Sequence, residues 1–174
     1  MTVSLSLRYL ALALLLSVIA GCGYHLTGAA TGKLGDARQI WVPFFSNESI
    51  SPTAQTVLRR AFYDEFHALR GLNPAAAEAN ADLVLKARIL SYSNRAVAYN
   101  SLDQAMLFSL TLNVELEIVK KGQDVPLWKG QLQAEKQYPA NSNLSLQHNS
   151  EDQALDAVAR ILAHKFLSAL EESY

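Results

Sequence analysis

The chain contains a single cysteine, Cys22, whose thiol is its best nucleophile. It follows Ala20 and Gly21, which end an uncharged apolar run preceded by Arg8. A basic start, a short apolar segment and small residues at the cleavage position are typical of a secretory signal peptide. The run is shorter than the roughly 20 apolar residues that span a bilayer as a helix. We therefore predict that residues 1–21 are removed rather than kept as an anchor.

The position of Cys22 also indicates a modification. The stretch Ile19-Ala20-Gly21-Cys22 resembles the bacterial lipobox, in which the cysteine thiol is diacylated and the new amino terminus is acylated. Several acyl chains, at roughly 0.8 kcal/mol per buried methylene, make a durable anchor. Gly23 stands where an aspartate favours retention in the inner membrane, so this resemblance implies the outer membrane. The alternative is a soluble secreted protein with a stray cysteine.

The chain that remains after cleavage is close to neutral. Arg8 is lost with residues 1–21, so 15 basic residues become 14 against 16 acidic ones, a formal charge of −2. This charge does not suggest a nucleic-acid-binding protein. With Cys22 acylated, no cysteine is left for a disulfide, so packing must stabilise the fold. Residues 22–37 are predicted to be a flexible tether and residues 38–174 a single domain.

Other residue types do not occur in spacings that favour catalysis. Glu115 and Glu117 share one face of a predicted strand at about 7 Å, within reach of a two-carboxylate mechanism, but paired glutamates on an exposed strand are far more often solvated. No serine lies in a G-x-S-x-G motif. The histidines lack metal-ligand spacing; they are His25, His67, His148 and His164. We therefore expect no enzyme, no metal and no cofactor beyond the covalent lipid.

Basic side chains are the remaining candidates for a binding site, because guanidinium and ammonium groups bind phosphate and carboxylate well. Four of them fall on the predicted polar face of a sheet or beside it: Lys86, Arg88, Arg95 and Lys129. The alternative is a solvated face on which Glu115, Glu117 and Glu135 balance the positive charges.

The strands that would position these residues follow from hydrophobic periodicity. Residues 106–118 place an apolar residue at every second position, which predicts a strand with one buried and one wet face. A hairpin turn is predicted at Lys121 to Asp124, and a returning strand over residues 128–138. Together with a strand that begins near Leu83, these segments predict an antiparallel meander.

The first strand of the meander changes parity within its length. Its alternation predicts a bulge near Ile89-Leu90, because one extra residue would return Leu90 and Tyr92 to the core side. The segment Ala96-Val97-Ala98-Tyr99, at or just beyond its end, is unusually apolar. It is either a buried strand end or an exposed tip that inserts into a partner.

Three further segments complete the predicted fold. Residues 38–45 are predicted to form a strand. Pro43 either confines this strand to an edge of the sheet or ends its regular hydrogen-bonding ladder. A helix is predicted from an N-cap at Ser51 to about Gly71, and a second helix opens with a capping box at Ser150 and Gln153. Both helices would pack on the apolar sheet face. The order β-α-β-β-β-α therefore predicts an α+β two-layer sandwich with a four-stranded, mainly antiparallel sheet.

Separated motifs agree with one family. They are Cys22-Gly23-Tyr24-His25-Leu26, Val42-Pro43-Phe44-Phe45 before an asparagine and a helix, Ala81-Asp82-Leu83, and the final helix. Over essentially the whole mature chain, this combination resembles LptE, a family of outer-membrane lipoproteins of lipopolysaccharide assembly. The resemblance implies a two-helix sandwich that plugs the large β-barrel LptD and contacts lipopolysaccharide. Basic residues on or beside strands are that family's proposed contacts, which makes the four basic residues above candidates by face assignment.

Two functions stay open at this point. One is a plug and assembly factor for an LptD-type barrel, lipid-anchored on the periplasmic side of the outer membrane. The other is an outer-membrane lipoprotein that activates a periplasmic cell-wall synthase. A long disordered tether is expected in the second case, whereas the predicted tether from Tyr24 to about Ala37 is short. This difference favours the first function.

Overall fold

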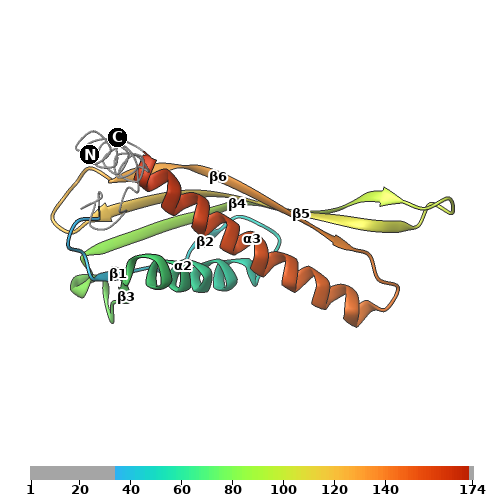
Figure 1. Ribbon diagram of the computed structural model, residues 1–174, viewed down its shortest axis with the longest axis horizontal. Coiled ribbons are helices and arrows are strands. Elements are labelled where there is room, and N and C mark those ends of the chain that lie inside the picture. The colour runs from blue at the N-terminus through green and yellow to red at the C-terminus, as the bar shows by residue number, and fades with distance from the viewer. Residues whose placement is uncertain (1–33, 173–174) are drawn as a thin grey trace, which may run out of the picture. The chain divides into compact units, whose positions relative to one another are not determined.

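A computed structural model describes residues 34–172, in which two helices cover one face of a six-stranded sheet (Figure 1). The elements are β1 (Gln39–Trp41), β2 (Ser46–Asn47), α2 (Ala54–Arg70), β3 (Asn73–Pro74), the 3-10 helix η1 (Glu78–Asn80), β4 (Leu83–Tyr99), β5 (Ala105–Lys120), β6 (Trp128–Pro139) and α3 (Leu144–Glu172). The α+β class is confirmed. The predicted signal peptide, Cys22 and most of the tether lie outside the described residues. Within residues 34–172, no helix is long and apolar enough to cross a membrane.

The sheet is mixed, so the prediction of four mainly antiparallel strands is wrong in detail. Its order is β3-β1-β4-β5-β6, with β2 also paired to β4, and both β1 and β2 run parallel to β4. Of the strand expected over residues 38–45, only β1 forms, and the chain leaves the sheet before it returns as β2. Pro43 has no amide donor, and the neighbouring Val42 bonds to α2 instead: its N–H donates to Tyr63 Oη at 2.9 Å, and its carbonyl accepts from Arg59 Nε at 2.6 Å.

The antiparallel meander of β4, β5 and β6 is confirmed, including its bulge. Ile89 lies opposite Val114 and Ser91 lies opposite Asn113, so Leu90 is the extra residue. Tyr92 returns to the core side as predicted, but Leu90 itself is not part of the core cluster. In the β5–β6 turn, Gly122 has a φ of 77°, a conformation that favours glycine.

The hairpin formed by β4 and β5 projects beyond β6 (Figure 1), because the pairing of β5 with β6 ends at Leu107 opposite Pro139. Sequence analysis left two alternatives for residues 96–99, a buried strand end and an exposed tip. The segment is exposed, because β4 continues to Tyr99 near the tip of this hairpin and Tyr99 is 60% exposed. Asn100 closes the tip: its Oδ1 accepts hydrogen bonds from the amides of Leu102 and Gln104.

Both helices begin at residues other than those predicted. Helix α2 follows Thr53 rather than Ser51, whose side chain is buried. Helix α3 begins at Leu144, six residues before Ser150, and Asn143 Oδ1 accepts hydrogen bonds from the amides of Ser145 and Leu146. The first turns of α3 bury no apolar residue, so they leave no periodic signal in the sequence.

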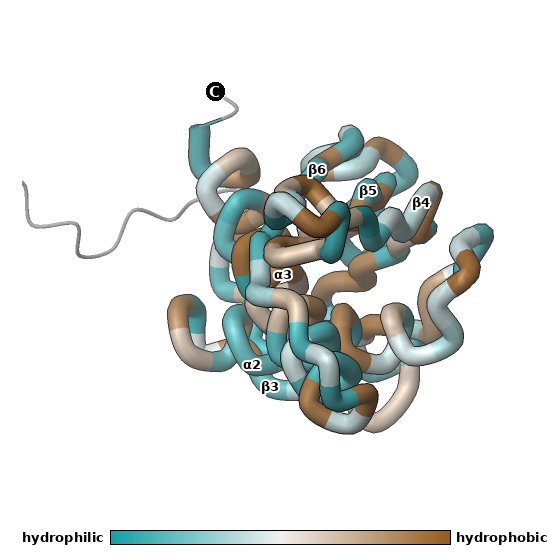
Figure 2. The backbone as a smooth tube through the Cα atoms, turned by 90° about the vertical axis from the view of Figure 1, so that its right-hand side faces the viewer, coloured by the Kyte–Doolittle hydropathy of each residue, from teal (hydrophilic) through white to brown (hydrophobic). Residues whose placement is uncertain are grey.

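The core lies between the sheet and the helices. Figure 2, which views the domain along its strands, shows β4, β5 and β6 on one side of this layer and both helices on the other. Phe166 of α3 lies at its centre, with ring centroids 5.7 Å from Phe62, 6.0 Å from Phe66 and 5.1 Å from Trp128. Gly130 leaves space for the indole, because a Cβ there would lie 2.8 Å from the Trp128 ring.

We expect Phe166→Ala to lower the free energy of unfolding by about 3–5 kcal/mol, because it opens a cavity among three aromatic rings. Chemical denaturation of the two proteins measures the difference. Arg160→Ala, at an exposed position of the same helix, is the matched control and should change stability by less than about 0.5 kcal/mol. A small effect of Phe166→Ala would show that α3 does not depend on this cluster.

Candidate functional site

The candidate site is the sheet face that the helices leave uncovered. Because successive side chains of a strand point to opposite faces, every second side chain of β4, β5 and β6 projects from it, and most of these are polar. The pairing register aligns them in rows across the strands. One row holds Arg88, Glu115 and Gln131, and the next holds Lys86, Glu117 and Lys129.

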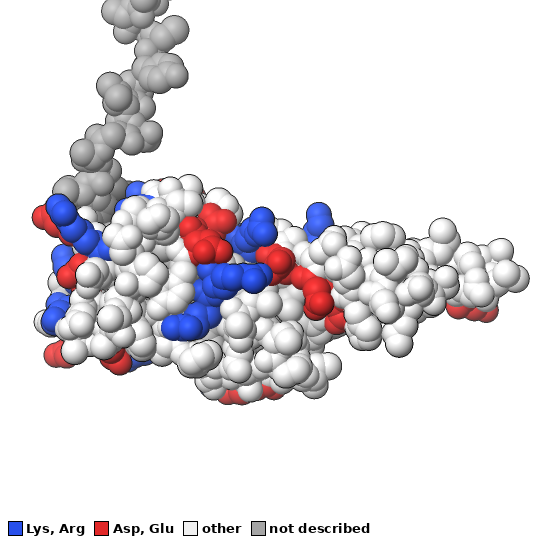
Figure 3. Space-filling view, turned by 90° about the horizontal axis from the view of Figure 1, so that it is seen from below, with Lys and Arg blue, Asp and Glu red and all other residues white. Residues whose placement is uncertain are grey.

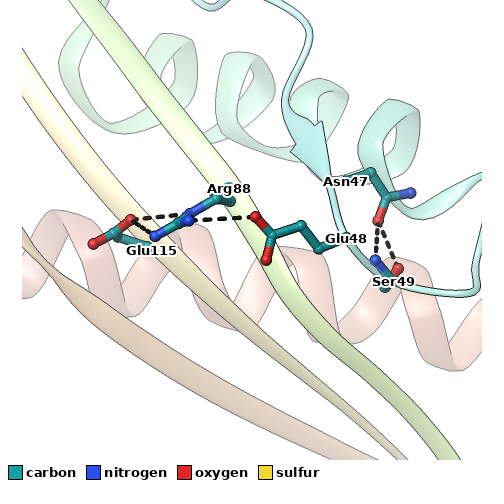
Figure 4. A network of polar contacts seen from close by, with 5 residues as sticks. All are labelled: Asn47, Glu48, Ser49, Arg88 and Glu115. Atoms are coloured by element: carbon teal, nitrogen blue, oxygen red, sulfur yellow. Dashed lines mark hydrogen bonds and ion pairs between the residues drawn. The ribbon is translucent and has the colours of Figure 1, made fainter.

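Arg88 holds two carboxylates from different elements (Figure 4). Its Nη2 lies 2.8 Å from Glu115 Oε2, its Nε lies 3.2 Å from the same oxygen, and its Nη1 lies 3.3 Å from Glu48 Oε1. Hydrogen bonding and charge attraction to Glu115, then attraction to Glu48, raise the pKa of the Arg88 guanidinium above its ordinary value. The arginine joins the loop after β2 to β5.

The loop that carries Glu48 is fixed by local hydrogen bonds. The Glu48 amide donates to Ile89 O at 3.1 Å, next to Arg88. Asn47 Oδ1 accepts from the amide and the hydroxyl of Ser49, as Figure 4 shows, and Asn47 Nδ2 donates to Ser51 O. The contact of Glu48 with Arg88 was not predicted from the sequence, because only the pairing of β2 with β4 brings this turn to the polar face.

The second row is paired more simply. Lys129 Nζ lies 2.8 Å from Glu117 Oε2, and the hydrogen bond to Glu117 raises the pKa of Lys129 above its ordinary value. Lys86 lies opposite Glu117, on the side away from Lys129, and makes no ion pair within residues 34–172. It borders a hollow of about 130 Å³ that is also lined by Arg88, Glu115 and Glu117.

Lys86 also borders a larger hollow near the beginning of β4. This hollow of about 310 Å³ is lined by Lys120, Lys121 and Glu78 among others. Sequence analysis placed Lys121 in a predicted turn and did not consider Lys120, so this hollow was not predicted. Asp82 also lies near Lys120 and Lys121, which lower the pKa of its carboxyl after the hydrogen bonds from the Arg38 and Gln39 amides, and Lys121 Nζ donates to Ala79 O at 2.7 Å.

The structure brings together three of the four predicted site residues. Lys86, Arg88 and Lys129 lie in adjacent rows, whereas Arg95 lies opposite Ser109, seven residues beyond Arg88 on the same strand. At about 3.3 Å per residue this separation is roughly 20 Å. Arg95 therefore belongs to the base of the projecting hairpin and not to the same cluster.

The projecting hairpin has a different character from the rest of the domain. It comprises residues 96–107, which contain one charged residue, Asp103, and it is white apart from its tip in Figure 3. Its exposed apolar side chains are Val97, Tyr99, Leu102 and Met106. This composition provides an apolar contact surface but no basic group for binding an anion.

The polar face has no arrangement that indicates catalysis. Glu115 and Glu117, considered above as a carboxylate pair, are each bonded to a cation. Among the residues that the structure describes, no group of three or more His, Cys, Asp or Glu residues could hold a metal ion. Of the histidines in that range, His164 Nε2 lies 3.1 Å from Glu65 and His67 Nδ1 lies 3.2 Å from Leu72 O. What the face can do chemically is bind anions and pair with polar surfaces.

Comparison with known families finds one that covers most of the chain. The family described as LptE, lipopolysaccharide-assembly, matches residues 37–170, which include both helices up to Leu170 and the whole sheet. No curated protein matches the chain by sequence.

Comparison with solved structures finds the same fold at low sequence identity. Rare lipoprotein B from Shewanella oneidensis has a TM-score of 0.52 and 13% identity, covering 76% of this chain and 93% of its own. Lipoprotein B from Nitrosomonas europaea has a TM-score of 0.52 and 9% identity, covering 78% and 83%. The PelC dodecamer of Paraburkholderia phytofirmans has a TM-score of 0.50 and 18% identity, covering 83% and 92%. At these identities the likeness establishes the fold alone.

The pairing in the second row predicts a measurable titration. Glu117→Gln should lower the pKa of Lys129 towards its ordinary value, because it removes the carboxylate that stabilises the ammonium form. NMR titration of the Lys129 side chain gives this pKa directly. Asp64→Asn on α2, in the other layer, is the control and should leave it unchanged. An unaltered pKa in Glu117→Gln would refute the pairing.

Proposed function

The chain belongs to the LptE family of lipopolysaccharide-assembly proteins, and we propose that it plugs an LptD-type β-barrel in the outer membrane and assists the assembly of that barrel. In this proposal residues 1–21 are cleaved, Cys22 is acylated, and the domain is held at the periplasmic side of the membrane. The family match over residues 37–170 and the lipobox-like stretch before Cys22 support it.

The observation that carries the proposal is the pairing of charges on the uncovered sheet face. Arg88 is paired with Glu115 and Glu48, and Lys129 with Glu117. An unpaired charge is costly to remove from water, whereas a paired and hydrogen-bonded one costs less. A face of this kind suits the polar wall of a barrel lumen, because hydrogen-bonding groups on both sides can pair without a large apolar patch.

We further propose that the basic cluster contacts the phosphorylated part of lipopolysaccharide. Lys86, Arg88 and Lys129 would act together, and Arg95 would make a separate contact nearer the hairpin. Lys86 is the strongest candidate, because it has no carboxylate partner within residues 34–172 that a phosphate would have to displace.

The plug function is tested by what remains bound to the native protein. After extraction from its own outer membrane in mild detergent, the chain should co-purify with a single large barrel protein. Mass spectrometry of the purified complex identifies the partner. Recovery of the chain alone would contradict the proposal, and recovery with a peptidoglycan synthase would favour activation of cell-wall synthesis instead.

Lipopolysaccharide binding is tested at Lys86. Lys86→Ala should weaken binding of lipopolysaccharide by at least about ten-fold, because one charge-assisted hydrogen bond contributes about 1.5 kcal/mol or more, and Lys86→Arg should retain it. Binding of labelled lipopolysaccharide to the purified chain measures the effect.

Lys136→Ala is the matched control, because Lys136 is an exposed lysine on the edge strand β6 that occupies the alternate, helix-side position. It should bind as the unaltered protein does. Equal losses of lipopolysaccharide affinity in both alanine variants would show that binding depends on overall charge. No loss of affinity in either variant would contradict a role for Lys86 in binding.

A further inference from the structure

Strand β6 forms an open edge of the sheet. It is the last strand in the order β3-β1-β4-β5-β6 and pairs only with β5. Figures 1 and 2 show no described strand on its outer side. An open edge presents unpaired amides and carbonyls, which readily bond to another strand.

The hydrogen-bond pattern identifies the groups that point outward. The Ala140 amide donates to Met106 O, and the β5–β6 register continues without a shift, so even-numbered residues of β6 bond to β5. The amides and carbonyls of the odd-numbered residues 129–137 therefore face away from the sheet. Lys165 Nζ donates to Gln133 O at 2.8 Å, which agrees with this assignment and is the one hydrogen bond to this edge from residues 34–172.

This edge lacks two features that commonly block strand addition. Pro139 is the only proline in β6 and lies at its end, and no bulge interrupts the strand. Charged side chains also protect edges, and β6 carries Lys129, Glu135 and Lys136. The spacing of the first two, however, makes the edge complementary to itself.

We propose that two copies of this chain associate through β6, antiparallel, about a two-fold axis at Leu132. In this register Lys129 of each copy lies opposite Glu135 of the other, and Gln131 lies opposite Gln133. All four of these residues have outward-facing backbone groups, so each opposed pair can exchange two hydrogen bonds.

The charge pattern selects this register over its neighbours. Opposite charges directly across two strands attract, and like charges repel. A shift of two residues in either direction places Lys129 opposite Gln133 or Gln137 and loses both ion pairs. The contact displaces Lys165 from Gln133 O, which costs little because the lysine is exposed. A single strand edge makes a small interface, so the pair should be weak and dependent on concentration.

The test uses charge reversal in the full-length chain, purified in detergent without lipopolysaccharide. Light scattering, corrected for bound detergent, should show a monomer–dimer equilibrium. Lys129→Glu and Glu135→Lys should each weaken the dimer by about ten-fold, because each opposes like charges at two places. The double variant, which combines both reversals, places opposite charges across the contact again and should restore the dimer. The ion pair of residue 129 with Glu117 within each copy remains lost in that variant.

A pair of proline variants provides an independent test. Gln131→Pro removes an outward amide inside the proposed contact, whereas Gln137→Pro removes one beyond it, and neither amide bonds to β5. Only Gln131→Pro should abolish the dimer, with circular dichroism confirming that both variants are folded. A monomer at every concentration, a dimer indifferent to the single charge reversals, or a double variant that fails to recover would overturn the proposal.

Discussion

Strand β5 pairs with β4 along one side and with β6 along the other, so its alternation of side chains determines both faces of the sheet. Leu110, Leu112, Val114, Leu116 and Ile118 are fully buried beneath the helices. The residues between them carry hydroxyl, amide and carboxylate groups to the opposite side. A one-residue slip of β5 would bury these polar groups and expose the leucines, which is why its register is strongly specified.

The polar face depends on this strand because its two glutamates organise the cations around them. Glu115 receives Arg88 from β4, and Glu117 receives Lys129 from β6. Arg88 extends the network to Glu48, in the loop after β2. Most of the face is thus neutralised, whereas Lys86 borders a hollow that Lys120, Lys121 and Glu78 also line. Such a surface pairs with polar groups while retaining a place for an anion.

Sequence periodicity predicted the parts of the fold that bury apolar side chains. The meander, the bulge at Leu90 and the common face of Lys86, Arg88 and Lys129 all follow from period two. The start of α3 could not be predicted in this way, because Leu144 and Leu146 are exposed and the helix is capped there by Asn143. Periodicity detects burial, and these turns are not buried.

The remaining differences have tertiary causes. The interruption after β1 depends on Tyr63 and Arg59 reaching Val42 from α2, more than fifteen residues along the chain. The contact of Glu48 with Arg88 spans forty residues and requires β2 to lie beside β4. No local pattern encodes either contact. The resemblance to LptE supplied a function that periodicity alone could not, and the family match confirms that membership.

The most direct test of this account is photo-crosslinking from the polar face in intact cells. A photoreactive residue at Asn113, on β5 between the rows of charged residues and the hairpin, should capture a large outer-membrane barrel protein. Capture of that barrel from Asn113 would place the uncovered sheet face against its wall. If Asn113 captured no barrel protein while the complex was present, the claim that this face meets the barrel would be contradicted.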